Sequence, residues 1–435
     1  MPFCGLDIHK KVVQAVIVND EGKVTLSLRF LATRAVIETF ARNHLTQNDR
    51  VALEATTNTW PIVAILQPFV MEVVVSNPLR TKAIAQAKIK TDKVDAKVLA
   101  QLLRADFLPN VWIPTSDTRL LRQRSTERSM LVSDRTSIKN RIHSIFHQRL
   151  LEVPVGDLFS VKNLAWLRNP PPALDAQGRA ALERQLRLFD QLQKEITTVT
   201  DQCAANAYQS PQIKLLMTLP GFDFCTAEGL LAALGDINRF PSADKVAPYL
   251  GLVPSTYQSA NHCYHGRITK QGRSHARWLL VEAAQAAANH PGPLGAFFRK
   301  LARKKNRNVA IVAVAHKLAT LVWYLLKNNE PYRYAQPQTL EAKLSRLRVR
   351  ATGEKRKGGL VKGQPRTEQY GKGRSRAIPS LDALYEREGL PPIQSLKAGE
   401  ERMLADQGLD KHARQVRTAR RVPKGSSKPS AKSEP

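Results

Sequence analysis

Hydrophobic residues in the first quarter of the chain recur with two different periods, which predict alternating strands and helices. Short apolar runs rich in β-branched residues and bounded by turn residues predict five strands, at residues 3–8, 12–18, 23–31, 50–54 and 72–76. Apolar positions at helical spacing predict helices at residues 35–44, 60–69 and 91–103. A three-stranded meander followed by alternating helix and strand is therefore expected.

This element order is that of an RNase H-like α/β fold, which we expect over residues 1–115. Residues 116–205 are predicted to be helical and heavily charged, with two long helices separated by the triple proline at residues 170–172. The pair is typical of an antiparallel coiled arm or a dimerisation element. Ordinary core helices give the same spacing, so both interpretations stay open.

The remainder of the chain is predicted to be a mostly helical domain followed by a tail. Apolar positions at helical spacing continue through residues 210–333. Gly, Lys, Arg, Ser and Pro then dominate, so we expect residues 334–435 to form a disordered basic tail with one short helix near residues 381–388. The whole is an α/β plus α protein.

The charge of the chain predicts a polyanionic partner. Its 435 residues include 67 Lys and Arg against 37 Asp and Glu, a formal net charge of +30. An excess of this size is typical of nucleic-acid-binding proteins. An anionic membrane is the competing partner, but no basic amphipathic anchor or lipidation motif stands out, and no apolar stretch is expected to reach transmembrane length.

The cysteines argue against a zinc ribbon or a disulfide framework. Cys4, Cys203, Cys225 and Cys263 are far apart and form no CxxC pair. A reducing, cytoplasmic location is therefore expected.

Four carboxylates in the first domain are candidate metal ligands. Asp7 lies in an apolar strand and Glu54 ends another, whereas Asp92 and Asp95 share one face of a helix. An acid within an apolar strand is costly unless it is paired or binds a cation. Mg²⁺ prefers such oxygen ligands, with Mn²⁺ as the alternative ion, and paired ions of this kind support phosphodiester cleavage. Taken alone, Asp92 and Asp95 are more typical of a solvated surface beside lysines than of metal ligands.

The motifs around these acids resemble the DEDD transposases of the insertion-sequence one-ten family, whose first domain is similar to the Holliday-junction resolvase RuvC. The matching segments of the first domain are GLDIHK at residues 5–10, EAT at 54–56 and KTDKVDA at 90–96. Those of the later domain are LPGF at residues 219–222, LLA at 230–232, GDI at 235–237, RF at 239–240, YLGLVP at 249–254, GRITKQG at 266–272 and AIVAVAHKL at 310–318. The resemblance covers about residues 3 to 330 in order.

The resemblance implies a recombinase that cuts and rejoins donor and target DNA. It implies guidance by a structured bridge RNA, an oligomer such as a homodimer or homotetramer, and active sites that combine the RuvC-like carboxylates of one subunit with a nucleophilic serine of another. It also implies a bacterial, nucleoid-associated protein.

Ser259 matches the family's nucleophilic serine. The family has glycine after this serine, where this chain has Ala260, so Ser255 stays a second candidate. A serine in such a loop is otherwise structural or capping. The cations that follow are expected to contact a scissile phosphate, with a solvated basic face as the alternative; they are Arg267, Lys270, Arg273 and Arg277.

Two other features carry weaker interpretations. His262, Cys263 and His265 crowd the serine segment, but a zinc site would need a fourth ligand, so we do not expect one. The turn at residues 219–221 resembles a helix-hairpin-helix turn that binds a DNA phosphate, although a plain helix-breaking turn fits it nearly as well.

Two rival functions remain at this point. One is a RuvC-type structure-selective nuclease that uses water as its nucleophile. The other is a non-catalytic nucleic-acid-binding protein, which the presence of all four acids disfavours.

Overall fold

The computed structural model of the chain describes residues 1–85, 91–259, 262–354, 375–396 and 398–423. They form two compact units, residues 1–115 and residues 116–435, and each unit is described by itself.

The first unit is built on a mixed five-stranded sheet. Its strands are β1 (Phe3–Ile8), β2 (Val12–Val18), β3 (Val24–Leu31), β4 (Arg50–Glu54) and β5 (Glu72–Ser76), in the spatial order β3-β2-β1-β4-β5. Strands β1, β2 and β3 pair antiparallel. Strand β4 pairs in parallel with β1, and β5 pairs in parallel with β4. This topology fits the predicted RNase H-like fold, and the predicted strands agree with the observed ones to within one residue.

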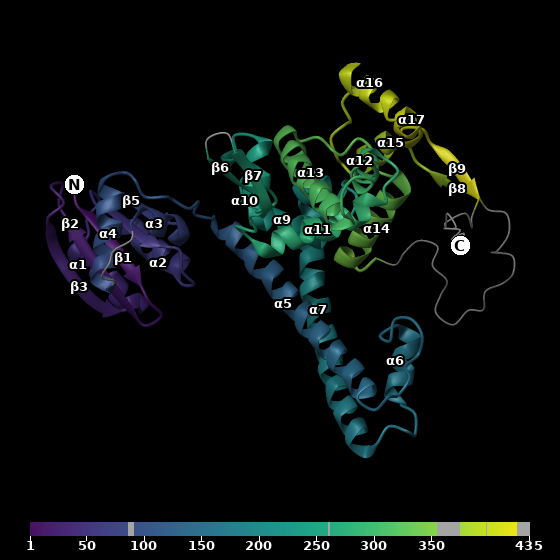
Figure 1. Cartoon of the computed structure of the whole chain (residues 1–435), viewed down its shortest axis with the longest axis horizontal. Coiled ribbons are helices and arrows are strands. Elements are labelled where there is room, and N and C mark those ends of the chain that lie inside the picture. Colours follow the sequence, from purple (N-terminus) through teal and green to yellow (C-terminus); the bar gives the residue numbers. More distant parts are fainter. Residues whose placement is uncertain (86–90, 260–261, 355–374, 397, 424–435) are drawn as a thin grey trace. The chain divides into compact units, whose positions relative to one another are not determined.

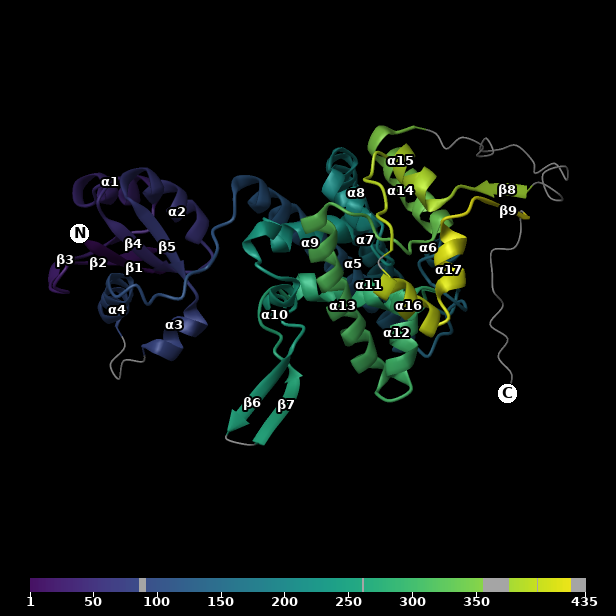
Figure 2. The ribbon, with the colours of Figure 1, turned by 90° about the horizontal axis from the view of Figure 1, so that it is seen from above.

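Helices cover both faces of this sheet (Figure 2). One face packs against α1 (Arg34–His44) and α2 (Thr59–Leu66), which continues into the short η1 (Gln67–Phe69). The other face packs against α4 (Asp92–Arg104), whereas α3 (Pro78–Ile84) follows β5. Because neighbouring residues of a strand point to opposite faces, the even-numbered residues of β1 face α1 and α2, and the odd-numbered ones face α4.

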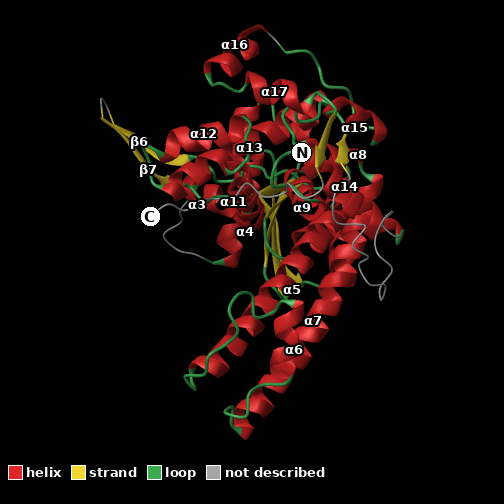
Figure 3. Cartoon of the chain, turned by 90° about the vertical axis from the view of Figure 1, so that its right-hand side faces the viewer, coloured by secondary structure: helices red, strands yellow, loops and turns green. Residues whose placement is uncertain are grey.

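Two long helices begin the second unit. Figures 1 and 3 show α5 (Ser116–His147) and α7 (Ala176–Gln209) side by side, with α6 (Val161–Arg168) between them in sequence. The last turns of α5 and the first half of α7 enclose a small core of their own, centred on Ile142, Phe146 and Leu186. Further along α7, Ala204 and Ala207 join the large core of the unit.

Residues 211–328 of the second unit are mostly helical and include one exposed hairpin. The elements of this segment are α8 (Pro211–Met217), α9 (Phe224–Leu234), η2 (Ile237–Arg239), η3 (Ala243–Lys245), α10 (Val246–Tyr249), the hairpin strands β6 (Pro254–Ser259) and β7 (His262–Ile268), α11 (Ser274–Ala288), α12 (Pro293–Ala302) and α13 (Arg307–Asn328).

Helix α13 corrects one prediction from the sequence. Its 22 residues are long and apolar enough to cross a membrane, so the expectation that no stretch reaches that length is wrong. In the structure Ile311, Val314, Leu318 and Val322 of this helix are buried in the core of the second unit. Core packing therefore accounts for its apolar composition.

The predicted disordered tail over residues 334–435 is wrong for the part that the structure describes. This part contains α14 (Pro337–Thr352), β8 (Ser375–Ile378), α15 (Leu381–Arg387), α16 (Ala398–Asp406), α17 (Asp410–Val416) and β9 (Arg420–Pro423). Leu340, Leu344 and Leu347 form a buried stripe on α14, and the Tyr385 hydroxyl donates a 2.6 Å hydrogen bond to the carbonyl of Tyr332. Residues 355–374 and 424–435 lie outside the described residues.

Replacing a buried residue of α14 should therefore destabilise the second unit. Leu344→Ala is expected to lower its free energy of unfolding by about 2–5 kcal/mol, because it removes apolar contacts and leaves a cavity. Thermal unfolding followed by calorimetry measures the loss, with Arg346→Ala, an exposed position on the same helix, as the control. Equal melting temperatures for the two variants would show that α14 is dispensable.

Candidate active site

Asp7 is positioned by the close approach of α4 to β1. A Cβ atom at Gly5 would lie 2.0 Å from the carbonyl oxygen of Ala96, so only glycine lets the helix backbone come so near. Asp7 is two residues further along the same face of the strand. The start of α4 therefore lies beside Asp7.

The other three predicted acids belong to the elements around Asp7. Leu6 pairs with Leu53 in the parallel ladder, so Glu54 follows one step later, as Asp7 does on β1. Asp92 and Asp95 lie in the first turn of α4, where the Thr91 side chain accepts a 3.3 Å hydrogen bond from the amide of Val94. The positive end of the helix dipole favours acids at this position.

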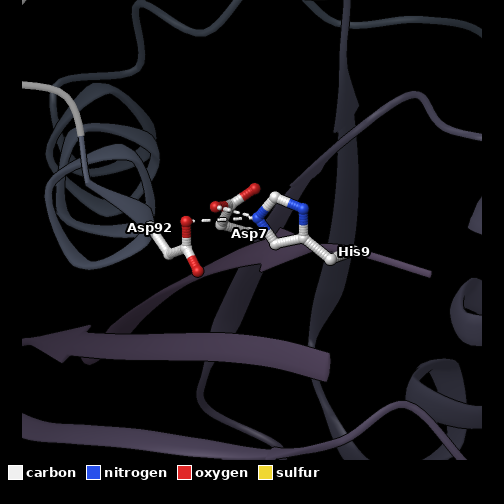
Figure 4. A group of neighbouring side chains, drawn as sticks. All are labelled: Asp7, His9 and Asp92. Atoms are coloured by element: carbon white, nitrogen blue, oxygen red, sulfur yellow. Dashed lines mark hydrogen bonds and ion pairs between the residues drawn. The ribbon is translucent and has the colours of Figure 1, made fainter. Parts of the chain in front are cut away.

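The structure brings Asp7 and Asp92 together around a histidine (Figure 4). The Nε2 atom of His9 lies 3.2 Å from Oδ2 of Asp7 and 3.3 Å from Oδ1 of Asp92. One ligand atom from each of the three residues lies within 4.8 Å of the other two. The exposed Arg29 of β3 forms an ion pair with Asp92, with its Nη2 3.7 Å from Oδ2 of Asp92.

The electrostatics of this cluster favour a bound cation. Burial, together with the negative charges of Asp92 and Asp95, raises the pKa of Asp7 above its ordinary value, and His9 opposes this shift. Carboxylates held close together repel one another, and a positive ion between them offsets this repulsion. The donor set of two carboxylates and one imidazole, open to solvent on the His9 and Asp92 side, fits a divalent metal.

His9 was not among the residues predicted from the sequence. The available signal was its spacing of two residues from Asp7, which continues the face of β1 that carries the acid. The search for carboxylates alone passed over it.

The shifted pKa of Asp7 has a consequence for stability. A raised pKa means that the folded protein holds this proton more tightly than the unfolded chain, so stability falls as the pH rises above the ordinary carboxyl value of 3.8. At neutral pH the charged Asp7 therefore destabilises the metal-free protein. Asp7→Asn is expected to raise the melting temperature at pH 7 in the presence of a chelator. The gain should vanish as the pH approaches 3.8; a lower melting temperature at pH 7 would contradict the assignment.

Ser259 lies on a β-hairpin, where a loop was expected. It is the last residue of β6, is exposed, and pairs with His262 of β7. Two glycines fasten the base of this hairpin: a Cβ at Gly251 would lie 2.3 Å from the carbonyl oxygen of Gln271, and one at Gly272 would lie 2.2 Å from that of Tyr249. Close backbone packing at these two glycines therefore fixes the base of the hairpin that carries the exposed Ser259.

The two candidate serines differ in their surroundings. The Ser255 hydroxyl donates a 3.2 Å hydrogen bond to the carbonyl of Arg267. It also occupies the space beside Gly266, where an added Cβ would lie 2.5 Å from the Ser255 Oγ. Among the described residues, the Ser259 hydroxyl has no such partner, and it lies near the end of the hairpin.

The four predicted cations lie on β7 (Arg267), on the segment that leads into α11 (Lys270 and Arg273) and in the first turn of α11 (Arg277). Arg267 and Lys270 are exposed, and Arg273 is half-buried. Arg277 is engaged in the fold, because its Nη1 donates hydrogen bonds of 3.1 and 3.3 Å to the carbonyls of Leu250 and Gln271.

The polar side chains of the hairpin contact one another. His265 has its Nδ1 3.0 Å from the hydroxyl of Thr256 and its Nε2 3.8 Å from the Cys263 sulfur. Across the residues that the structure describes, these side chains form no three-residue metal group with His262.

In the turn at residues 219–221, a Cβ at Gly221 would lie 2.3 Å from the carbonyl oxygen of Ala283, so close packing already requires this glycine.

Comparison with known proteins gives matches to both units. Residues 4–149 match the family model of DEDD transposases of the IS110 type, and residues 213–299 match that of the transposase IS116/IS110/IS902 family. The chain is 24% identical over 347 residues to the transposase for insertion sequence element IS1111A of Coxiella burnetii, covering 76% of this chain and 90% of that protein. It is 25% identical over 356 residues to the pilin gene-inverting protein of Moraxella bovis, covering 76% of this chain and 97% of that protein.

Proposed function

The chain belongs to the IS110 family of transposases, and from this premise we propose that it cuts and rejoins DNA with the acids of the first unit and Ser259 of the second. The observation that carries the proposal is the cluster of Asp7, His9 and Asp92 at the junction of β1 and α4. The matched families are described as transposases, and one relative is named for inverting a gene.

The acids are proposed to hold the metal. Asp7 and Asp92 would supply carboxylate oxygens, with Glu54 and Asp95 beside them and His9 as a further donor. Bound there, Mg²⁺ or Mn²⁺ would activate the attacking oxygen and offset the negative charge that develops on the phosphate. Asp7 is partly buried on the α4 face, and one of its carboxylate oxygens lies within 4.8 Å of ligand atoms of His9 and Asp92.

Ser259 is proposed to be the nucleophile. Its hydroxyl is exposed near the end of a hairpin whose base is fixed, whereas that of Ser255 is held against β7. Attack forms a bond between Oγ and phosphorus while the bond from phosphorus to the leaving oxygen of the strand breaks, and that oxygen takes up a proton. Arg267, Lys270 and Arg273 are proposed to contact the phosphate, and Arg277 to hold the turn beneath them.

We also propose that the enzyme acts as a homodimer or homotetramer on donor and target DNA, guided by a bridge RNA. The net charge of +30 supports extensive contacts with nucleic acid, and the resemblance to the family supports the RNA and the assembly.

Recombination with copurifying RNA tests this function. RNA that copurifies with the full-length protein should be sequenced and added back with donor and target duplexes and Mg²⁺. We expect joined strands only when protein, RNA and divalent ion are all present. Hydrolysed ends that never join, with no dependence on RNA, would instead identify a structure-selective nuclease.

A further inference from the structure

A cavity of about 530 Å³ lies in the second unit, where α5, α7, α9 and α11 meet. The face of α5 toward it carries hydroxyls at helical spacing, Ser125, Ser129 and Ser133. A cavity walled by helices is ordinarily lined with apolar side chains, which the surrounding core supplies in abundance. The hydroxyls on the α5 side of this cavity, beside its apolar surface, suit a ligand that has both polar groups and an apolar face.

An aromatic surface forms the α11 side of the cavity. The Trp278 side chain stacks on the ring of His275, with centroids 5.8 Å apart and planes inclined by 20°, and it is 51% exposed. Hydrogen bonds fix the His275 ring, whose Nε2 and Nδ1 atoms each lie 3.3 Å from the hydroxyls of Ser125 and Ser129 respectively. The indole is therefore held on a rigid support while much of its surface faces solvent.

The charge at the cavity is positive. Arg128 lines it and is held by a 2.9 Å hydrogen bond from its Nε to the Thr200 hydroxyl. Among the described residues, no carboxylate forms an ion pair with Arg128. The one acid in the lining, Glu228, is already bound by Arg124 and by the Asn206 amide. Burial and the nearby charge of Arg128 lower the pKa of His275, so its imidazole is neutral at pH 7 and adds no competing charge.

We propose that this cavity binds an unpaired nucleotide of a nucleic-acid strand, with the base stacked on Trp278 and the phosphate at Arg128. Exposed aromatic rings beside arginines are how proteins bind single strands, because every base offers a face for stacking. The hydroxyls of α5 suit the sugar, whose oxygens both donate and accept hydrogen bonds. The inference rests on the proposed function only in that the ligand is nucleic acid.

Fluorescence of the full-length protein tests the stacking. With a chelator present to prevent cleavage, titration with a 12-nucleotide oligouridylate or oligothymidylate should quench tryptophan emission, and the matched duplex should not. Trp278→Phe keeps a ring for stacking but removes this indole, so binding measured by anisotropy should persist while the quenching is lost. Tighter binding of the ribonucleotide strand would identify RNA as the source of the nucleotide, and tighter binding of the deoxyribonucleotide strand would identify DNA.

Affinity measurements test the site independently. Trp278→Ala is expected to weaken single-strand binding about 5- to 100-fold and to leave duplex binding unchanged. Ser133→Phe, which fills the mouth of the cavity from an exposed position, should do the same without disturbing the core. Tyr324→Ala removes a ring of similar exposure (47%) elsewhere in the unit and is the control.

Two results would overturn the inference: unchanged single-strand affinity in both Trp278→Ala and Ser133→Phe, or equal weakening of duplex and single-strand binding. Either leaves the carboxylate site untouched, since metal-dependent cleavage by the same variants is measured separately. Loss of cleavage in Asp7→Ala combined with normal quenching would conversely support the cavity whatever the outcome for recombination.

Discussion

Asp7→Ala is expected to abolish metal-dependent strand cleavage by the full-length protein, lowering the rate by roughly 10²- to 10³-fold or more. Asp7 is more buried than Asp92, and burial together with the nearby charges of Asp92 and Asp95 raises the pKa of Asp7. Its removal leaves the cluster without the ligand that β1 holds in place. Nucleic-acid affinity should be unchanged or slightly higher, because affinity comes from lysine and arginine contacts with phosphate.

The measurement is single-turnover cleavage of labelled DNA alongside a binding titration at the same salt concentration. Glu54→Ala, Asp92→Ala and Asp95→Ala should behave like Asp7→Ala. Glu21→Ala, an exposed acid of the same unit, should cleave normally. Excess chelator should reproduce the loss in the unmodified protein.

Replacement of His9 tests whether this histidine contributes to the metal site beside the carboxylates. If it serves as an additional donor and orients Asp7 and Asp92, His9→Ala should lower cleavage about 10- to 100-fold, less than loss of an acid. Added Mn²⁺ should restore part of that loss if the acids alone still bind the ion. Full activity of Asp7→Ala, or of the unmodified protein in chelator, would rule out the carboxylate assignment altogether.

The first unit was predictable because its signals are local. The apolar runs of β1, β2, β4 and β5 follow from packing on both faces of one sheet. Asp7 and Glu54 stood out because an acid in an apolar strand has a cost that only a partner offsets. His9 did not stand out, since its importance depends on the distance to Asp92 across 83 residues of sequence, which spacing along one strand does not give.

The later part of the chain was predicted less well, for a physical reason. Averaged composition from residue 334 onward is basic and rich in Gly and Pro, and it hides the stripe of Leu340, Leu344 and Leu347. Cations on the exposed face of α14 lower the mean hydropathy without weakening the buried face. The hairpin was missed similarly, because its exposed strands lack the apolar alternation that marks half-buried ones.

Ser259→Ala is expected to remove a covalent protein–DNA adduct that forms during the reaction of the unmodified protein. A serine hydroxyl is a weak nucleophile at neutral pH, so adduct formation should also require the carboxylates and disappear in Asp7→Ala. A phosphoserine link keeps the phosphodiester energy available for joining to a new strand, whereas attack by water releases it. Ser259→Ala should therefore lose joined products by at least about 10³-fold.

Denaturing gels of reactions stopped in detergent detect the adduct, and mass spectrometry of nuclease-treated peptides locates it. Ser255→Ala is the matched control, because Ser255 lies on the same strand as Ser259. This variant should retain substantial activity, because the Ser255 hydroxyl donates its hydrogen bond to the Arg267 carbonyl. Ser259→Cys offers a second variant with the fold intact and a different nucleophile.

These measurements distinguish the mechanisms, because each mechanism predicts a different bond to the phosphate after cleavage. An adduct on Ser259 identifies the recombinase mechanism. An adduct on Ser255 would require the hairpin to open at the Arg267 carbonyl, and it would move the nucleophile to the half-buried end of β6. Cleaved DNA without any adduct, equally abundant in Ser259→Ala, would leave water as the nucleophile. The acids of β1, β4 and α4 would then belong to a nuclease, and the exposed serine at the end of β6 would have no part in the chemistry.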